Sequence, residues 1–283
     1  MSEIRKPAVA SMFYPDEKIN LKKMINTFLS NVPDDVTEYF IKKRIDNLFG
    51  IISPHAGYVY SGSVAAHAYA LLKQKAVDTI ILIGPSHYNQ FSGYALTHFS
   101  AFETPLGEIP VDEKLTAIIN ERGRNVFEYV DTAHIREHSI EVQLPFLQTT
   151  LINNFKIVPI LMGEQTISNV TLGADILKDV LSTYDKSYLI VISSDLSHYY
   201  SDEAAHKLDD RFLEIVEGMD AQKLMQALSV GETEACGGGP VAVLLELAKK
   251  MSRGSIRNLV YNNSGDTSGD YSRVVGYLAS AVW

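Results

Sequence analysis

The sequence predicts a single α/β domain built on a mixed sheet. Four short apolar runs, bounded by Gly, Pro or Ser, are separated by helical segments, which is typical of buried strands in a parallel sheet. Hydrophobic residues make up 46% of the 283 residues and charged residues 21%, so the chain can build a large core. No internal repeat or linker-like stretch divides it, and we therefore expect one domain over residues 1–283.

The buried strands and the main helices follow one another along the chain. Apolar runs predict strands at residues 48–52, 79–83, 156–162 and 188–193. Helical segments between or after these strands are expected at about residues 63–74, 139–151, 168–183 and 202–217. This alternation of strand and helix places parallel strands side by side in the sheet.

Other segments make the predicted sheet mixed. Residues 94–111 alternate between apolar and polar side chains and hold Thr104-Pro105-Leu106-Gly107, which indicates a hairpin or an edge excursion. A short helix is expected near 221–228, and a second, apolar helix should begin after the Cys236-Gly-Gly-Gly-Pro240 turn and end near residue 251. Two final strand-like runs, 256–261 and 273–279, flank a polar loop.

Composition excludes several classes of function. The formal net charge of −9 and the lack of a basic run disfavour a general nucleic-acid binder. No stretch reaches the ~18 apolar residues of a membrane span and the first residues lack an apolar signal region, so we expect a cytoplasmic protein. Walker A, Gly-x-Gly-x-x-Gly, His-Glu-x-x-His and Gly-x-Ser-x-Gly patterns are missing, which disfavours ATP, dinucleotide and hydrolase sites.

Two predicted strands each lead into a histidine. The strand at 48–52 is followed by His55 and the strand at 79–83 by His87. If these strands are parallel neighbours joined by the helix at 63–74, both imidazoles lie at one edge of the sheet, where α/β proteins bind ligands. A lone histidine after a strand is more often a loop or core residue. Two in matching positions favour a metal site.

Further polar side chains are expected at the same edge. The strand at 188–193 is followed by Asp195 and His198, and His138 lies where a helix is predicted to begin, with Ser139 as a possible cap residue. An alternative is that Asp195 caps the next helix and that His138 is an exposed residue of a first turn. The four other histidines fit no site pattern and are interpreted as structural: His67, His98, His134 and His206.

Cys236 is the single cysteine, so no disulfide can form within the chain. It precedes three glycines and Pro240, where the backbone can approach other groups closely and a helix begins. A helix N-terminus lowers the pKa of a thiol, and the thiolate is the form that binds metal or attacks electrophiles. We expect a functional thiolate here; the alternative is a small buried apolar residue in a flexible turn.

The sequence around these histidines and Cys236 resembles the Memo family, whose microbial members are also called AmmeMemoRadiSam system protein B. The matching elements run nearly from end to end: Arg5-Lys-Pro-Ala-Val-Ala-Ser-Met-Phe-Tyr-Pro15, Ser53-Pro-His-Ala-Gly-Tyr-Val-Tyr-Ser-Gly62, Gly84-Pro-Ser-His87, Thr104-Pro-Leu-Gly107, Glu137-His-Ser-Ile-Glu141, Ser193-Ser-Asp-Leu-Ser-His198 and Cys236-Gly. The resemblance implies a three-layer α/β/α fold similar to that of the class III extradiol ring-cleaving dioxygenases, with helices on both faces of a mixed central sheet.

The resemblance also implies a metal site. The dioxygenases hold non-haem Fe(II) with two histidines and a carboxylate; His55 and His87 match the two histidines, whereas Cys236 falls at the third position. Since a soft thiolate shifts metal preference, dioxygenase activity is not carried over. Iron(II) is the expected ion, with copper next and zinc after them. His198 resembles the acid/base histidine, Asp195 would orient it or bind the ion, and His138 would complete the pocket.

Three functions are compatible with these residues and with the resemblance. The first is a redox or oxygen-dependent metalloenzyme acting on a small substrate, for which an aromatic compound is one candidate. The second is a non-catalytic protein that keeps the crevice to bind metal or a peptide. The third is an enzyme in which Cys236 is a nucleophile without metal. By family association, AMMECR-type and radical SAM proteins are expected partners, and a homo-oligomer is compatible with the sequence.

Overall fold

A sheet of nine strands forms the centre of the molecule in the computed structural model, which describes residues 3–283. Its strand order is β10-β12-β2-β9-β3-β8-β4-β7, and β11 also pairs with β12. The four central strands, β2 (Gly50–Ser53), β9 (Tyr188–Ser193), β3 (Thr79–Pro85) and β8 (Lys156–Met162), are parallel. All four strands predicted as buried apolar runs therefore form the middle of the sheet.

The outer strands make the sheet mixed. On one side β12 (Val274–Val282) is antiparallel to β2, and β10 (Asp195–Tyr200) and β11 (Ile256–Asn263) are antiparallel to β12. On the other side β4 (Tyr94–Leu96) is antiparallel to β8, and β7 (Phe127–Tyr129) is parallel to β4. The mixed sheet expected from the sequence is confirmed.

A small second sheet is formed by β1 (Ile4–Arg5), β5 (Ala101–Thr104) and β6 (Gly107–Pro110). Strands β5 and β6 are an antiparallel hairpin whose turn contains the Pro105-Leu106 pair, as the sequence predicts. Strand β1 pairs in parallel with β5, which fixes the N-terminal segment beside this hairpin.

Helices cover both faces of the large sheet, because the strands are apolar on both sides. Side chains such as Ile80 and Leu82 face one core and Ile81 and Ile83 face the other. The first core is covered by α1 (Lys18–Ser30), α3 (Tyr58–Ala70) and α6 (Leu144–Thr150). The second is covered by α4 (Glu113–Arg122), α7 (Ile167–Leu181), α8 (Asp202–Glu217), α9 (Ala221–Ser229) and α10 (Gly238–Lys250).

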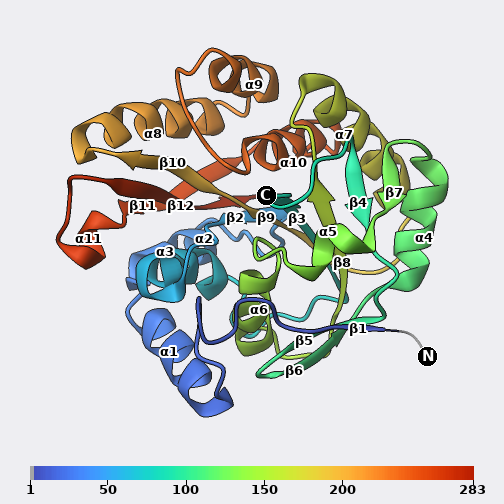
Figure 1. The fold of residues 1–283 in the computed structure, drawn as a ribbon, viewed down its shortest axis with the longest axis horizontal. Helices are drawn as coiled ribbons and strands as arrows, with labels where there is room; N and C mark the ends of the chain where they lie inside the picture. The colour runs from blue at the N-terminus through green and yellow to red at the C-terminus, as the bar shows by residue number, and fades with distance from the viewer. Residues whose placement is uncertain (1–2) are drawn as a thin grey trace.

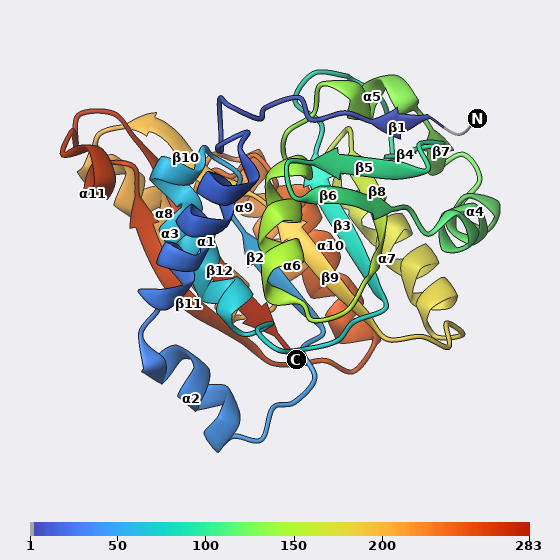
Figure 2. The ribbon, with the colours of Figure 1, turned by 90° about the horizontal axis from the view of Figure 1, so that it is seen from below.

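The three-layer α/β/α fold is thereby confirmed. Figure 1 shows α8, α9 and α10 above the sheet and α1, α3 and α6 below it. Figure 2 shows the same molecule from below, with α2 (Asp34–Lys42) set apart from the other helices. The short helices α5 (Asp131–Ile135) and α11 (Gly265–Ser268) lie in connecting segments. Within residues 3–283, no helix combines the length and the apolar character that a membrane span requires.

Three local predictions are wrong in ways that matter for the site. Strands β2 and β3 are not direct neighbours, since β9 lies between them. The helix expected from Ser139 begins at Leu144, after a 3-10 turn at Glu141–Gln143. Ser139 is not a cap residue, because its hydroxyl is buried and donates to the carbonyl of Pro85.

A fourth difference concerns the segment after β9. The alternative to a site role, that Asp195 and His198 form a loop and cap cluster, is wrong, because both lie on β10, an irregular strand paired with β12. The N-cap of the following helix is Ser201, and no cap bond comes from Asp195. Short polar strands such as β10 have no continuous apolar run, so periodicity does not reveal them.

Candidate metal centre

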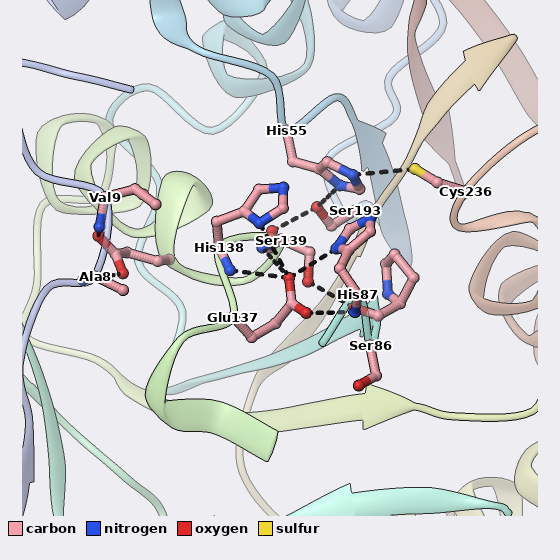
Figure 3. A network of polar contacts seen from close by, with 12 residues as sticks. Ala8, Val9, His55, Ser86, His87, Glu137, His138, Ser139, Ser193 and Cys236 are labelled. Carbon is pink, nitrogen blue, oxygen red and sulfur yellow. Dashed lines mark hydrogen bonds and ion pairs between the residues drawn. The ribbon is translucent and has the colours of Figure 1, made fainter. Parts of the chain in front are cut away.

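Three histidines converge at the carboxyl edge of the parallel strands. His55 follows β2, His87 follows β3, and His138 lies in the segment before the 3-10 turn. One potential ligand atom from each lies within 4.8 Å of the other two. Figure 3 shows the three rings gathered around one space, with Cys236 beside His55. Solvent exposure increases across the cluster, from the buried His55 through His138 to the exposed His87, so one side of it is open to solvent.

The topology explains why residues far apart in the sequence meet here. Strands β2, β9 and β3 are adjacent and parallel, so the residues that follow them leave the sheet at the same edge. The insertion of β9 between β2 and β3 does not separate the imidazoles, because His55 and His87 have ring centroids 5.1 Å apart. It also brings the hydroxyl of Ser193, the last residue of β9, into contact with Nδ1 of His55.

Glu137 holds His87 in one orientation. Its carboxylate accepts a hydrogen bond from Nδ1 of His87 at 2.9 Å and from the backbone N–H of His87 at 2.6 Å. Burial acts to raise the pKa of Glu137, but the bonds and charge of His87 and the backbone N–H groups outweigh it and lower the pKa to about 2. The ionised carboxylate can only accept, so Nδ1 of His87 carries a proton, and in the neutral imidazole the free lone pair is on Nε2.

A second network fixes His55. Nδ1 of His55 lies 2.8 Å from the hydroxyl of Ser193, which donates its own proton to the carbonyl of Ser139 at 2.5 Å. The same hydroxyl accepts from the amide of Gln143 at 2.9 Å, and that amide is oriented by donating to the carbonyl of Pro54. Since the only hydroxyl proton is already used, Nδ1 of His55 must donate, and Nε2 is the unprotonated nitrogen.

His138 completes the cluster with an unsatisfied nitrogen. Its Nδ1 is buried, lies 3.4 Å from Oε1 of Glu137 and makes no hydrogen bond to the residues that the structure describes. The ring stacks on His87 with centroids 4.6 Å apart, and Phe13 packs against it at 5.0 Å. Buried polar atoms without partners are rare in folded proteins and often mark the place of an absent ion or water. A metal ion among the three imidazoles would fit this donor set.

Burial keeps two of these imidazoles, those of His55 and His138, neutral. It lowers the pKa of His55 well below the usual value, assisted by the charges of His87, His138 and His198. It also lowers the pKa of His138 to about 4. A neutral imidazole is the form that binds a metal ion. At neutral pH His55 and His138 therefore present lone pairs rather than positive charges.

Cys236 lies against His55 but outside the group of three. Its Sγ is 3.0 Å from Nε2 of His55 and accepts from the backbone N–H of Asp195 at 3.2 Å. The following Gly237 is required by close packing, since a Cβ there would lie 2.4 Å from the carbonyl oxygen of Ser193. Sulfur and imidazole are thus held in direct contact.

The thiol does not have the low pKa expected from its sequence position. Burial, and then the negative charge of Asp195, raise the pKa of Cys236 well above its usual value. The N-terminus of α10 follows Cys236, but desolvation of the sulfur outweighs its effect. Without a bound cation Cys236 is a thiol, and the contact of its sulfur with Nε2 of His55 is also the geometry of a thiol beside a general base.

Asp195 and His198 have separate partners. Asp195 accepts the backbone N–H of His55 at 2.7 Å, and burial raises the pKa of its carboxyl to about 6. The backbone N–H of His198 donates to Glu234 at 3.3 Å, and its Nδ1 lies 3.9 Å from the same carboxylate. The structure thus brings His138 together with His55 and His87, places Cys236 and Asp195 against His55, and leaves His198 at the margin.

Sequence reasoning missed the residues that orient the imidazoles. Glu137, Ser193 and Gln143 were not singled out, although each holds a histidine or the group that binds it. The available signals were weak: Glu137 precedes His138 directly, and Ser193 ends a predicted strand. The four histidines interpreted as structural lie outside the cluster: His67, His98, His134 and His206.

The chain is similar to proteins of one family over nearly its whole length. A family model described as "Memo-like protein" matches residues 5–281. A MEMO1 family protein of Methanobrevibacter smithii is 43% identical over 281 residues, covering 98% of each chain. Another, of Saccharolobus solfataricus, is 40% identical over 282 residues, again covering 98% of each chain. A third, of Methanosarcina acetivorans, is 38% identical and covers 99% of each.

A solved structure shares the fold. The crystal structure of an uncharacterized protein from Escherichia coli K12 superposes with a TM-score of 0.57 and 10% sequence identity. The match covers 84% of this chain and all of that one. At this identity the likeness concerns the arrangement of strands and helices alone.

Proposed function

The chain belongs to the Memo-like protein family, and from this premise we propose that His55, His87 and His138 hold one transition-metal ion at the edge of the sheet. Iron(II) is the first candidate, copper the second and zinc the third. The proposed activity is redox chemistry with oxygen on a small aromatic substrate. One observation carries the proposal: three imidazole nitrogens lie within 4.8 Å of one another.

The second layer of side chains supports a metal site. Histidines that bind metal commonly donate their other ring N–H to a carboxylate or another acceptor, which fixes the tautomer. His87 does so toward Glu137 and His55 toward Ser193, so each offers Nε2. Imidazole suits iron, copper and zinc. A bound cation would favour the thiolate of Cys236, which lies beside His55 and would become a further ligand.

The chain's own residues would serve distinct steps. A redox-active ion would supply electron transfer and polarise the groups bound to it. The exposed side of His87 admits substrate from solvent, while buried His55 and its hydrogen bonds keep the ligand set in place. His198 stands at the margin on β10 and would accept or donate a proton, because imidazole exchanges protons near neutral pH.

A second candidate is a metal carrier that does no oxygen chemistry. The observation that favours it is the direct contact of Cys236 with His55, because a soft sulfur ligand suits Cu(I). Such a protein would hold copper tightly and suppress its reaction with oxygen. The same ligand cluster would then serve sequestration instead of catalysis.

Oxygen consumption distinguishes the two. The protein is loaded anaerobically with Fe(II) or Cu(I) and mixed with a set of catechols in air-saturated buffer. An enzyme consumes oxygen with substrate, and His198→Gln lowers turnover by about 100-fold while the metal content stays unchanged. His206→Gln, on an exposed face of α8, is the matched control. Tight Cu(I) binding without oxygen consumption under any loading would favour the carrier.

A further inference from the structure

A cavity of about 710 Å³ lies between the first turn of α7 and one side of α9. Both helices pack against α10, and Figure 1 shows the three next to one another on the same face of the sheet. Glu234 and Ala235, which lead into Cys236, form part of the wall of the cavity. Its volume is in the range of sites that hold small organic ligands.

Two hydrogen bonds join this cavity to the margin of the candidate metal centre. Gln165, in the wall, donates its side-chain amide to the carbonyl of Cys236 at 2.6 Å. Glu234, also in the wall, accepts the backbone N–H of His198 at 3.3 Å. A ligand in the cavity would therefore lie against residues that contact Cys236 and His198, but outside the group of three histidines.

The lining of the cavity carries one charge. Ile167, Met225 and Leu228 contribute apolar side chains, and the polar lining residues other than Glu234 are glutamines, threonines and a serine. Among the described residues that line the cavity, Glu234 is thus the single charged one. A ligand with a hydrocarbon body gains free energy by leaving water for such a surface, and Glu234 decides which charge it carries.

The carboxylate of Glu234 has no basic counter-charge. Within residues 3–283 it forms no ion pair with lysine or arginine, and Nδ1 of His198 stands 3.9 Å away. By contrast, Glu232 pairs with Arg211. Bonds from the backbone of His198 and the hydroxyl of Tyr200 hold the Glu234 carboxylate in place, and its four lone-pair sites leave it able to accept more. This oriented, uncompensated carboxylate favours a cation.

The helix end beside the cavity does not reverse this preference. A helix N-terminus attracts anions, and Thr166 and Ile167 begin α7 at the cavity. The hydroxyl of Thr166 already accepts the N–H of Asn169, so this end is capped by the chain itself. The formal net charge of −9 adds a general attraction for cations. An anion would meet Glu234 in the cavity and no basic side chain.

We propose that this cavity binds a small organic cation, a primary amine on an apolar chain. The ammonium group donates to the carboxylate of Glu234, while the hydrocarbon contacts Ile167, Met225 and Leu228. The site uses none of the three clustered histidines and needs no metal ion. The inference therefore goes beyond the proposed function and does not depend on it.

A matched pair of ligands tests the charge. n-Hexylamine and 1-hexanol share one chain and differ in the terminal group. Each is titrated into the isotope-labelled full chain, where amide NMR shifts report both affinity and place of binding. The amine should bind at least about 10-fold more tightly, as a charge-assisted hydrogen bond implies, with shifts centred on Glu234 and Ala235. Glu234→Gln should abolish the preference, whereas Glu232→Gln, outside the cavity, should keep it.

Filling the cavity tests the apolar part. Ile167→Trp adds a ring at a lining residue that is 44% exposed, so the fold tolerates it, and binding of both ligands should be lost. Leu172→Trp is the matched control, because Leu172 is equally exposed on the same helix and does not line the cavity. Unchanged binding in Ile167→Trp would overturn the inference.

Two further results would contradict it. One is equal affinity for the amine and the alcohol. The other is a preference that survives in Glu234→Gln, as expected of an amine that coordinates a metal ion. Metal content of the same samples is measured in parallel, so a metal-free protein that prefers the amine through Glu234 would uphold this site even if the metal centre fails.

Discussion

Two buried carboxylates four residues apart, Glu137 and Glu141, have different partners and different roles. Glu141 pairs with Arg5, accepts from the backbone N–H groups of Ala8 and Val9, and accepts the hydroxyl of Tyr14. All these partners come from the N-terminal segment. We call this group the anchor, because its hydrogen bonds and ion pair hold the N-terminal segment on the carboxylate.

Glu137 is also buried, but one of its hydrogen-bond partners, His87, belongs to the histidine cluster. It binds Nδ1 of His87, whose other nitrogen points to the histidine cluster, and the neighbouring His138 keeps a buried nitrogen without a partner among the described residues. The partners of the two residues distinguish a structural carboxylate from one that serves a site. A buried carboxylate that forms an ion pair with arginine stabilises the fold, whereas one that accepts a hydrogen bond from histidine orients that histidine for metal binding.

The largest expected effect concerns the anchor. Glu141→Gln leaves the buried Arg5 without its counter-charge and should lower the free energy of unfolding by about 3–5 kcal/mol. Arg5 also donates to the backbone carbonyls of His134 and Glu137, so the loop keeps part of its support. Urea denaturation measures the loss. The affinity of the folded variant for metal should change by less than about 3-fold. A large loss of metal affinity would show that the anchor and the histidine cluster are not separate in function.

The next effect is a pH dependence of stability at His134, whose backbone carbonyl accepts from Arg5 of the anchor. Burial lowers the pKa of His134 from 6.5 to about 4. The unfolded chain thus takes up this proton below about pH 6.5 and the folded chain only near pH 4, so stability falls as the pH drops between these values. The contribution of His134 to the free energy of unfolding is on the order of 3 kcal/mol.

His134→Gln tests this contribution, since glutamine can donate to the carbonyl of Ala95 as His134 does without titrating. Urea unfolding at several pH values between 6.5 and 4 should show a shallower decline for the variant. Metal content at neutral pH should be unaffected. Identical slopes for the two proteins would show that His134 is not a buried neutral residue.

A smaller effect is expected from Glu137. Glu137→Gln removes the ionised acceptor that fixes His87 and should weaken metal binding by about 10- to 100-fold. Competition with a chromophoric chelator measures the affinity, and Glu141→Gln is the matched control on the same segment. If both variants bind metal as the native chain does, the contrast between the two carboxylates has no functional meaning.

The smallest effect is expected from Ser193. Ser193→Ala removes the acceptor for Nδ1 of His55, whereas Gln143 keeps its bond to the carbonyl of Pro54. Metal affinity should fall by about 10-fold or less, in the lower part of the range for such supporting groups. Ser280→Ala is the control, because Ser280 is fully buried on β12 and its hydroxyl donates to Asn258 rather than contacting a histidine. Equal affinities in the two variants would contradict the role of the hydroxyl.

The sequence could predict the central strands because buried parallel strands are continuous apolar runs. It also predicted that residues after β2 and β3 meet at one edge, and the structure brings His55 and His87 together there. It could not predict that β9 separates the two strands, because strand order depends on long-range packing. The hydrogen bonds of Ser193 and Gln143 to this cluster depend on that order.

The ligand set shows the limit of local reasoning. Cys236 was favoured because a helix N-terminus lowers a thiol pKa, but the depth of burial, which reverses the shift, is not readable from neighbouring residues. His138 was placed in the pocket as an auxiliary residue, whereas the structure puts its nitrogen within reach of both other histidines. Whether Cys236, His138 or both bind the ion stays a prediction.

Metal content of the anaerobically purified chain tests the central claim most directly. Mass spectrometry would be applied to the native protein and to His55→Ala, His87→Ala, His138→Ala and Cys236→Ser. We predict near-stoichiometric iron or copper in the native chain, its loss in all three histidine variants, and at least partial retention in Cys236→Ser. A native protein without metal after reconstitution with Fe(II) and Cu(I), or metal retained in His138→Ala and lost in Cys236→Ser, would contradict the three-histidine centre.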